Sequence, residues 1–155
     1  MSLPIWHTNT SPPQFAIPGA ETSPLYLYTT INPEHLPRWM LGPEGWTMPV
    51  CEIDLRVGGA WHFVWRQFDG TEMAMRGVYR EIVPPERLVC TESWGADWPE
   101  TLNTVVLSEK DGRTTIMLTV LYPSKEARDA ALKTGMTDGM SMTFDRLEEH
   151  LRTMA

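Results

Sequence analysis

The sequence is poor in the residue patterns that mark metal and redox sites. Its 155 residues contain two cysteines, Cys51 and Cys90, and four histidines, with no CxxC, HxH or HxxxH spacing. A zinc centre needs three or four convergent ligands, and such local pairs usually supply some of them. We therefore expect no metal and no cofactor. The two cysteines are expected to be free thiols that pack as small hydrophobic side chains.

Positive charge and long apolar runs are also scarce. The chain has 13 Lys and Arg against 20 Asp and Glu, a formal net charge of −7. Nucleic-acid binding depends on a basic surface, so we expect no nucleic-acid partner. No apolar run approaches the roughly 18 residues of a membrane span, and residues 1–19 lack a secretory signal pattern. We expect an acidic, cytoplasmic protein with no membrane contact.

Motifs of two large enzyme classes are missing as well. No GxSxG is present, which excludes the nucleophile elbow of α/β-hydrolases. The glycine pair at 58–59 lacks the GxxxxGK pattern of a phosphate loop and leads into a strand.

Alternating strands dominate what is present. Apolar and polar residues alternate with period two between turn residues, which predicts an antiparallel sheet. The expected strands cover residues 50–55, 60–68, 73–80, 87–94, 102–109 and 113–122. In the first, Cys51, Ile53 and Leu55 share a face. Asp69-Gly70 predicts a tight hairpin turn.

The C-terminal residues predict one long helix. Its apolar stripe is spaced by three and four and consists of Leu132, Met136, Met140, Phe144, Leu147 and Leu151. Ser124 is the expected N-cap, and Glu126 lies in the first turn, where the helix dipole favours an anion. Gly135 and Gly139 within this helix indicate either a flexible lid or close backbone packing.

The N-terminal region predicts less structure. Five prolines make residues 1–24 a mostly irregular arm. Residues 25–31 are β-branched and aromatic and predict a strand. A short helix is expected from Pro33, with Asn32 as its N-cap and Pro37 limiting it to about two turns.

Several of these segments resemble a known family, the homologues of the activator of heat-shock-protein-90 ATPase within the START-like, helix-grip superfamily. The segments that carry the resemblance are PEHLPRW (33–39), CEIDLRVGG (51–59), GVYREIVPPERLVCTESW (77–94), YPSKEARDAALKTGM (122–136) and GMSMTFDRLEEHL (139–151). The resemblance implies an α+β helix-grip fold over residues 25–155. In it, a curved antiparallel sheet of six to seven strands wraps around a long C-terminal helix, with short helices after the first strand.

The N-terminus departs from the family pattern. The family begins with a strand and a helix of the type APxxVWxAxTDPEHL, whereas this chain reads SPLYLYTTINPEHL. A missing first strand would leave one sheet edge open and favour a homodimer formed by edge pairing.

The combined interpretation is a domain that binds a small apolar or aromatic molecule between the sheet and the last helix. The expected lining residues are Trp39, Trp61, Phe63, Trp65, Met73, Met75, Trp94, Met136, Met140 and Phe144. The same bulky residues also fit a solid core. Glu92 shares a strand face with apolar residues. It is therefore expected to be either a catalytic acid or base, or a structural carboxylate. In the second case it lies near the mouth of the barrel or pairs with Arg56 or Arg76. A cyclase- or hydrolase-like enzyme using Glu92 and a co-chaperone bound to a chaperone are the alternative functions.

Overall fold

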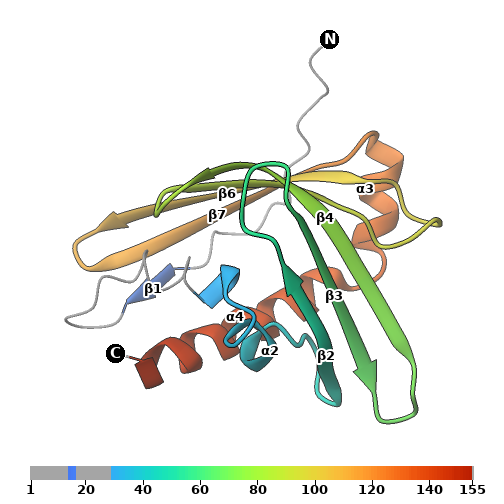
Figure 1. Ribbon diagram of the computed structural model, residues 1–155, viewed down its shortest axis with the longest axis horizontal. Coiled ribbons are helices and arrows are strands. Elements are labelled where there is room, and N and C mark those ends of the chain that lie inside the picture. The colour runs from blue at the N-terminus through green and yellow to red at the C-terminus, as the bar shows by residue number, and fades with distance from the viewer. Residues whose placement is uncertain (1–13, 17–28, 155) are drawn as a thin grey trace.

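The computed structural model describes the backbone of residues 14–16 and all of residues 29–154 (Figure 1). One seven-stranded sheet has the order β1-β7-β6-β5-β4-β3-β2, and neighbouring strands are antiparallel. The strands are β1 (Gln14–Ala16), β2 (Trp46–Ile53), β3 (Ala60–Gln67), β4 (Glu72–Val83), β5 (Arg87–Glu92), β6 (Thr101–Lys110) and β7 (Arg113–Leu121). The helices are α2 (Leu36–Trp39), α3 (Lys125–Leu132) and α4 (Met136–Met154). The sheet is strongly bent, and α4 crosses one of its faces. The predicted α+β helix-grip fold is confirmed.

The central hairpin forms as its sequence predicts. Alternation along β3 buries Trp61, Phe63 and Trp65, which are 4%, 6% and 4% exposed. Gly70 has φ +87°, and the Asp69 carboxylate accepts a hydrogen bond from the Thr71 backbone N–H at 2.8 Å. Both features belong to tight turns, in which glycine supplies the positive φ and aspartate bonds the backbone two residues on.

Strand β2 lies earlier in the chain than predicted. It begins at Trp46 and ends at Ile53, so Leu55 falls beyond it and is 42% exposed. Cys51 and Ile53 pack against the core as expected. The assignment of Leu55 to their face was wrong because the chain turns away from the sheet after Ile53.

The predicted single C-terminal helix is in fact two helices. Between α3 and α4 the chain turns at Gly135, whose φ of +79° is a left-handed conformation that ends helices. Gly135 is therefore a helix terminator and not a mid-helix glycine. The apolar stripe continues along α4, where Leu147 and Leu151 are fully buried.

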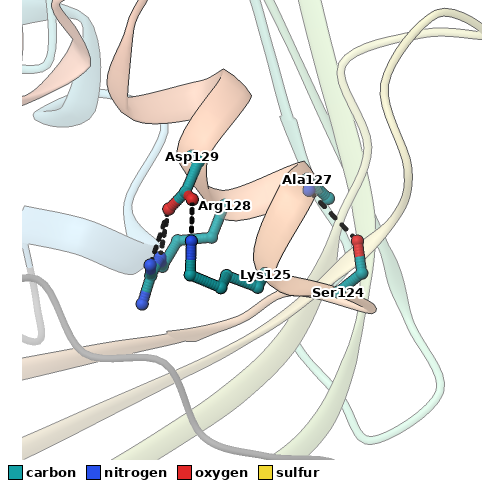
Figure 2. Close-up of polar contacts among 5 residues, drawn as sticks. All are labelled: Ser124, Lys125, Ala127, Arg128 and Asp129. Carbon is teal, nitrogen blue, oxygen red and sulfur yellow. Dashed lines mark hydrogen bonds and ion pairs between the residues drawn. The ribbon is translucent and has the colours of Figure 1, made fainter.

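The N-terminus of α3 is capped as predicted. The Ser124 hydroxyl accepts a hydrogen bond from the Ala127 backbone N–H at 3.1 Å, and Glu126 lies in the first turn. Figure 2 shows this cap beside the Asp129 carboxylate, which pairs with Lys125 at 2.5 Å and with Arg128 at 2.6 Å. These contacts fix the start of α3 directly after the last strand.

Helix α4 is fastened to the segment that precedes β2. Thr143 accepts a hydrogen bond from the Gly42 N–H at 3.1 Å, and the Arg146 guanidinium donates to the Gly42 carbonyl. Nearer the C-terminus, His35 Nδ1 lies 3.1 Å from His150 Nε2. Together these contacts hold α4 against the α2 segment, as Figure 1 shows. No helix within residues 29–154 is long and apolar enough to cross a membrane.

The region before β2 differs from its sequence prediction. Thr29–Ile31 is helical, so the strand predicted at 25–31 is wrong there, and residues 25–28 lie outside the described residues. The Asn32 side chain accepts a hydrogen bond from the Glu34 N–H at 2.9 Å, and the turn that follows leads into α2. Helix α2 has four residues with Pro37 in its first turn, where proline is tolerated. Asn32 therefore stabilises a turn and does not cap a two-turn helix.

Strand β1 lies inside the predicted irregular arm. It pairs with the β7 residues Arg113–Thr115, so an edge strand is present at that end of β7. We expected edge-to-edge dimers if the first strand was missing and left this sheet edge open. Along these residues of β7 the edge is covered by β1. A homodimer and a domain boundary at residue 25 stay predictions.

Gly139 offers a test of helix energetics in α4. The nearest neighbour of an added Cβ would be the Pro43 Cδ atom at 3.9 Å, an ordinary van der Waals contact. Alanine costs less conformational entropy in a helix than glycine does. We expect Gly139→Ala to raise the free energy of unfolding by about 0.5–1 kcal/mol. Urea denaturation followed by circular dichroism would measure this, and a loss of stability would contradict the open packing at this position.

A candidate binding site on the concave face of the sheet

Cross-strand pairing places apolar and polar side chains on the face that α4 covers. Side chains of directly paired residues in antiparallel strands point to the same face. Phe63 pairs with Met75, and on the neighbouring strands Cys90 pairs with Asn103 and Glu92 with Thr101. Buried members of this face share one core cluster with Leu147 and Leu151 of α4. The face has an aromatic part on β3 and a polar part where β5 ends and β6 begins.

Aromatic rings form a continuous wall over the first part. The ring centroids of Trp61 and Phe63 are 4.8 Å apart, and those of Phe63 and Trp65 are 6.1 Å apart with the planes at 84°. Trp65 stacks on Trp94 at 5.6 Å and 16°, and its indole N–H donates to the Met40 carbonyl at 2.7 Å. Trp94 is 36% exposed, so the wall begins at the surface and continues into the buried side of the sheet.

Trp61 contains an unusual buried donor. Its six-membered ring lies over Gly77, and its indole N–H has no hydrogen-bond partner among the described residues. The N–H faces the Cys90 thiol closely enough to lower that thiol's pKa, but the contact does not have hydrogen-bond geometry. Burying a donor without a well-formed hydrogen bond costs about 1–3 kcal/mol.

The polar part is centred on the Glu92 carboxylate. One oxygen accepts a hydrogen bond from the Trp94 indole N–H at 2.6 Å, and the other accepts one from the Asn103 amide at 2.5 Å. The Thr101 hydroxyl donates to the Asn103 carbonyl oxygen at 3.1 Å, which turns the Asn103 NH₂ group toward Glu92. Thr101 and Asn103 are both 7% exposed. Three side chains therefore hold the carboxylate in one orientation.

Burial dominates the electrostatics of this part. It raises the pKa of Glu92, although the hydrogen bonds from Trp94 and Asn103 oppose the rise. Burial, with a smaller contribution from Glu92, also raises the pKa of Tyr122 and brings that of the Cys90 thiol to about 12. Cys90 is consequently an unreactive thiol at neutral pH.

The arginine partners considered for Glu92 are not found. Arg56 pairs with Asp54 at 2.9 Å, and no Lys, Arg or His of residues 29–154 forms an ion pair with Glu92. The same part of the chain contains no group of three or more His, Cys, Asp or Glu placed to hold a metal ion.

The other predicted lining residues differ in burial. Met75 is 3% exposed within the core, whereas Met73, near the hairpin end, is 40% exposed. Trp39 is 2% exposed and its indole N–H donates to the Thr29 carbonyl at 3.4 Å, so it lies inside the α2 packing. On α4, Met136, Met140 and Phe144 are partly buried, and Met136 sulfur accepts a hydrogen bond from the Tyr122 hydroxyl at 3.5 Å.

Sequence reasoning missed Thr101, Asn103 and Tyr122. Tyr122 lies at the end of a predicted strand, and Thr101 lies in the loop expected before residues 102–109. Asn103 is a polar residue that the structure places on the buried face, opposite Cys90. The polar side chain of Asn103 was the only hint in the sequence. The register of β5 against β6 is needed to show that this side chain lies beside Glu92.

Residues 25–152 match the model of the family described as Activator of Hsp90 ATPase homolog 1-like protein. The chain belongs to this family. The match covers most of the 155 residues and confirms the resemblance found in the sequence, including its place in the START-like superfamily. Among proteins with curated descriptions, none matches the chain significantly.

Solved structures share the fold of this family member. A protein from Rhodobacter sphaeroides is 28% identical with a TM-score of 0.80, and the alignment covers 84% of this chain and 85% of that one. A protein from Nitrosomonas europaea is 23% identical with a TM-score of 0.77 over 91% of each chain. An AHSA1-like protein from Aeromonas hydrophila is 18% identical with a TM-score of 0.63 over 82% of each chain.

The raised pKa of Glu92 predicts a pH dependence of stability. Because the folded protein holds this proton more tightly than the unfolded chain, the stabilising contribution is complete below the unfolded pKa. It is lost as the pH rises through the folded pKa. In Glu92→Gln this pH-dependent loss is absent, so the variant should gain stability relative to the wild type as the pH increases from about 4 to 8. Urea denaturation at a series of pH values would measure the difference, and a difference that does not change with pH would contradict the shift.

Proposed function

We propose that this chain binds a small apolar or aromatic molecule between the concave face of the sheet and α4. START-like folds often bind hydrophobic ligands, and this chain places an aromatic wall on the corresponding face. The observation that supports binding most strongly is the continuity of that wall, which runs from the 36% exposed Trp94 through Trp65 to the buried Phe63 and Trp61.

The lining of the proposed site has the character of a ligand pocket. Pockets for small molecules are lined mainly by apolar and aromatic side chains, with a few placed polar groups that fix orientation. Here Trp61, Phe63, Trp65 and Met75 would form the sheet side, and Met136, Met140 and Phe144 the helix side. Glu92 and Asn103 would be the orienting polar groups. The physiological ligand would be small and hydrophobic, and cytoplasmic location stays a prediction.

A fluorescent apolar probe tests the proposal. N-phenyl-1-naphthylamine brightens in apolar surroundings and accepts energy from tryptophan, so we expect saturable one-to-one binding with quenching of the tryptophan emission. Met140→Trp adds volume on the helix side of the proposed site and should weaken probe binding by about tenfold or more. The matched control is Met142→Trp, because Met142 lies on the same helix and is 48% exposed. No saturable binding to the wild type, or equal binding to folded Met140→Trp, would refute the proposal.

One observation favours a second function, an enzyme that uses Glu92 as an acid or base. A desolvated carboxyl with a raised pKa is suited to proton transfer near neutral pH. In that case Glu92→Gln would retain binding of the substrate and lose turnover, whereas a pure binding protein would show no turnover in either form. Fold alone does not decide between the two functions. The described residues offer no feature specific to chaperone activation, which therefore remains the last-ranked alternative.

A further inference from the structure

The Glu92 carboxylate combines fixed hydrogen-bond donors with the lack of an ion pair to any basic side chain of residues 29–154. We propose that the molecule bound on the concave face has a positively charged amine that pairs with Glu92, while its aromatic or apolar body lies against Trp65 and Trp94. This inference rests on the proposed binding function and specifies its ligand class. It follows from three features of the site: the acceptor capacity of the carboxylate, its missing counter-charge and the tryptophan pair beside it.

The carboxylate is held as an acceptor. An ionised carboxylate has about four acceptor positions, and the Trp94 and Asn103 donors occupy one on each oxygen. Asn103 donates to Glu92 through its NH₂ group, while its carbonyl oxygen accepts a hydrogen bond from the Thr101 hydroxyl. Each oxygen has a further acceptor position, and a group that donates hydrogen bonds fits it.

The missing counter-charge makes a cationic donor the best match. Buried carboxylates are usually paired, yet no basic side chain of residues 29–154 forms an ion pair with Glu92. An ammonium group on the ligand would supply the charge and three donors. A carboxylate or phosphate on the ligand would instead meet a like charge. The net charge of −7 also attracts a cation at longer range.

The tryptophan pair adds a second attraction for the same group. Trp65 and Trp94 stack with their planes at 16°, and the edge of Trp94 carries the N–H that binds Glu92. The face of an indole ring attracts a nearby cation, and Trp is the strongest of the aromatic side chains in this respect. Because Trp94 is 36% exposed, this end of the aromatic wall is accessible from solvent. An amine entering there reaches the carboxylate while its ring continues the aromatic wall inward.

A matched pair of probes tests the charge requirement. Both 2-(1-naphthyl)ethylamine and 2-(1-naphthyl)ethanol carry the same ring and differ in the ammonium or hydroxyl group. Each is used to displace N-phenyl-1-naphthylamine from the wild type at pH 7. We expect the amine to bind about tenfold or more tightly than the alcohol, the range of a charged hydrogen-bonded pair.

Variants then assign the preference to Glu92. Glu92→Gln should lose the preference for the amine, measured as the ratio of the amine and alcohol affinities within that variant. The control is Glu100→Gln, which removes the same charge from an exposed residue of the neighbouring loop and should leave the preference intact. Loss of the preference in both variants would indicate long-range attraction and overturn the assignment to Glu92.

The outcomes separate this inference from the proposed function. If N-phenyl-1-naphthylamine binds but the amine and the alcohol displace it equally, the site exists and the amine inference is wrong. If that probe does not bind, direct titration of the amine by calorimetry decides: binding that Glu92→Gln abolishes keeps the amine site without the apolar one. Absence of any binding overturns both.

Discussion

Gly77→Ala should destabilise the protein strongly, costing about 3 kcal/mol or more. A Cβ at this position would lie 1.8 Å from the Thr91 carbonyl oxygen and 2.6 Å from two atoms of the Trp61 ring. The first neighbour is backbone of the adjacent strand, which cannot move without breaking the pairing of β4 with β5. The second is a buried indole in the aromatic wall. Urea denaturation should show a large fall in the transition midpoint, or no folded protein.

Gly139→Ala provides the control for this prediction. It adds the same methyl group at a helical position where the nearest contact is 3.9 Å away, and it should stabilise the protein. Opposite signs for the two variants would support the packing of Trp61 across Gly77. A loss below about 1 kcal/mol for Gly77→Ala would mean that Trp61 moves freely, which contradicts the fixed aromatic wall.

Trp65→Ala should cost about 3–5 kcal/mol of unfolding free energy. Trp65 is 4% exposed, donates to the Met40 carbonyl at 2.7 Å and stacks on Trp94. Its removal leaves a large cavity, an unpaired carbonyl and an unsupported Trp94. Because Trp94 donates to Glu92, the orientation of the carboxylate should loosen as well. Denaturation curves measure the first effect, and loss of any selectivity for the naphthyl amine measures the second.

Phe68→Ala is the matched control for Trp65→Ala. Phe68 is an aromatic residue just after the same strand, but it is 94% exposed. Its replacement should change the unfolding free energy by less than about 0.5 kcal/mol and leave ligand selectivity unchanged. Similar losses for both variants would show that side-chain burial does not control stability in this hairpin.

The sheet was predictable from the sequence because local signals and burial agree along most of its strands. Period-two alternation on β3 identified the buried faces of Trp61, Phe63 and Trp65, and Asp69-Gly70 identified the turn. Ser124 was recognised as a helix cap because its position follows a strand-ending proline. In each case the backbone conformation depends on residues close in sequence.

The features that were not predicted depend on longer-range structure. The break at Gly135 requires a positive φ that the helical spacing of the apolar stripe does not reveal. Thr29–Ile31 has β-branched residues, yet it is helical in a fold where Thr29 and Trp39 are in contact. The Glu92 site depends on which residue of β6 lies opposite Glu92 and Cys90, and register is set by the whole sheet. Glu92 was therefore found from its strand face, whereas Thr101 and Asn103 were not.

The most direct test of the central claim, ligand binding on the concave face, is mass spectrometry of the purified protein under native and denaturing conditions. The proposal predicts a reproducible small molecule that accompanies the folded protein and is released on unfolding. The amine inference further predicts that this molecule contains a basic nitrogen and is reduced in Glu92→Gln but not in Glu100→Gln. A protein of unliganded mass that also fails to bind N-phenyl-1-naphthylamine would contradict the claim and show that the aromatic wall is the centre of a filled core.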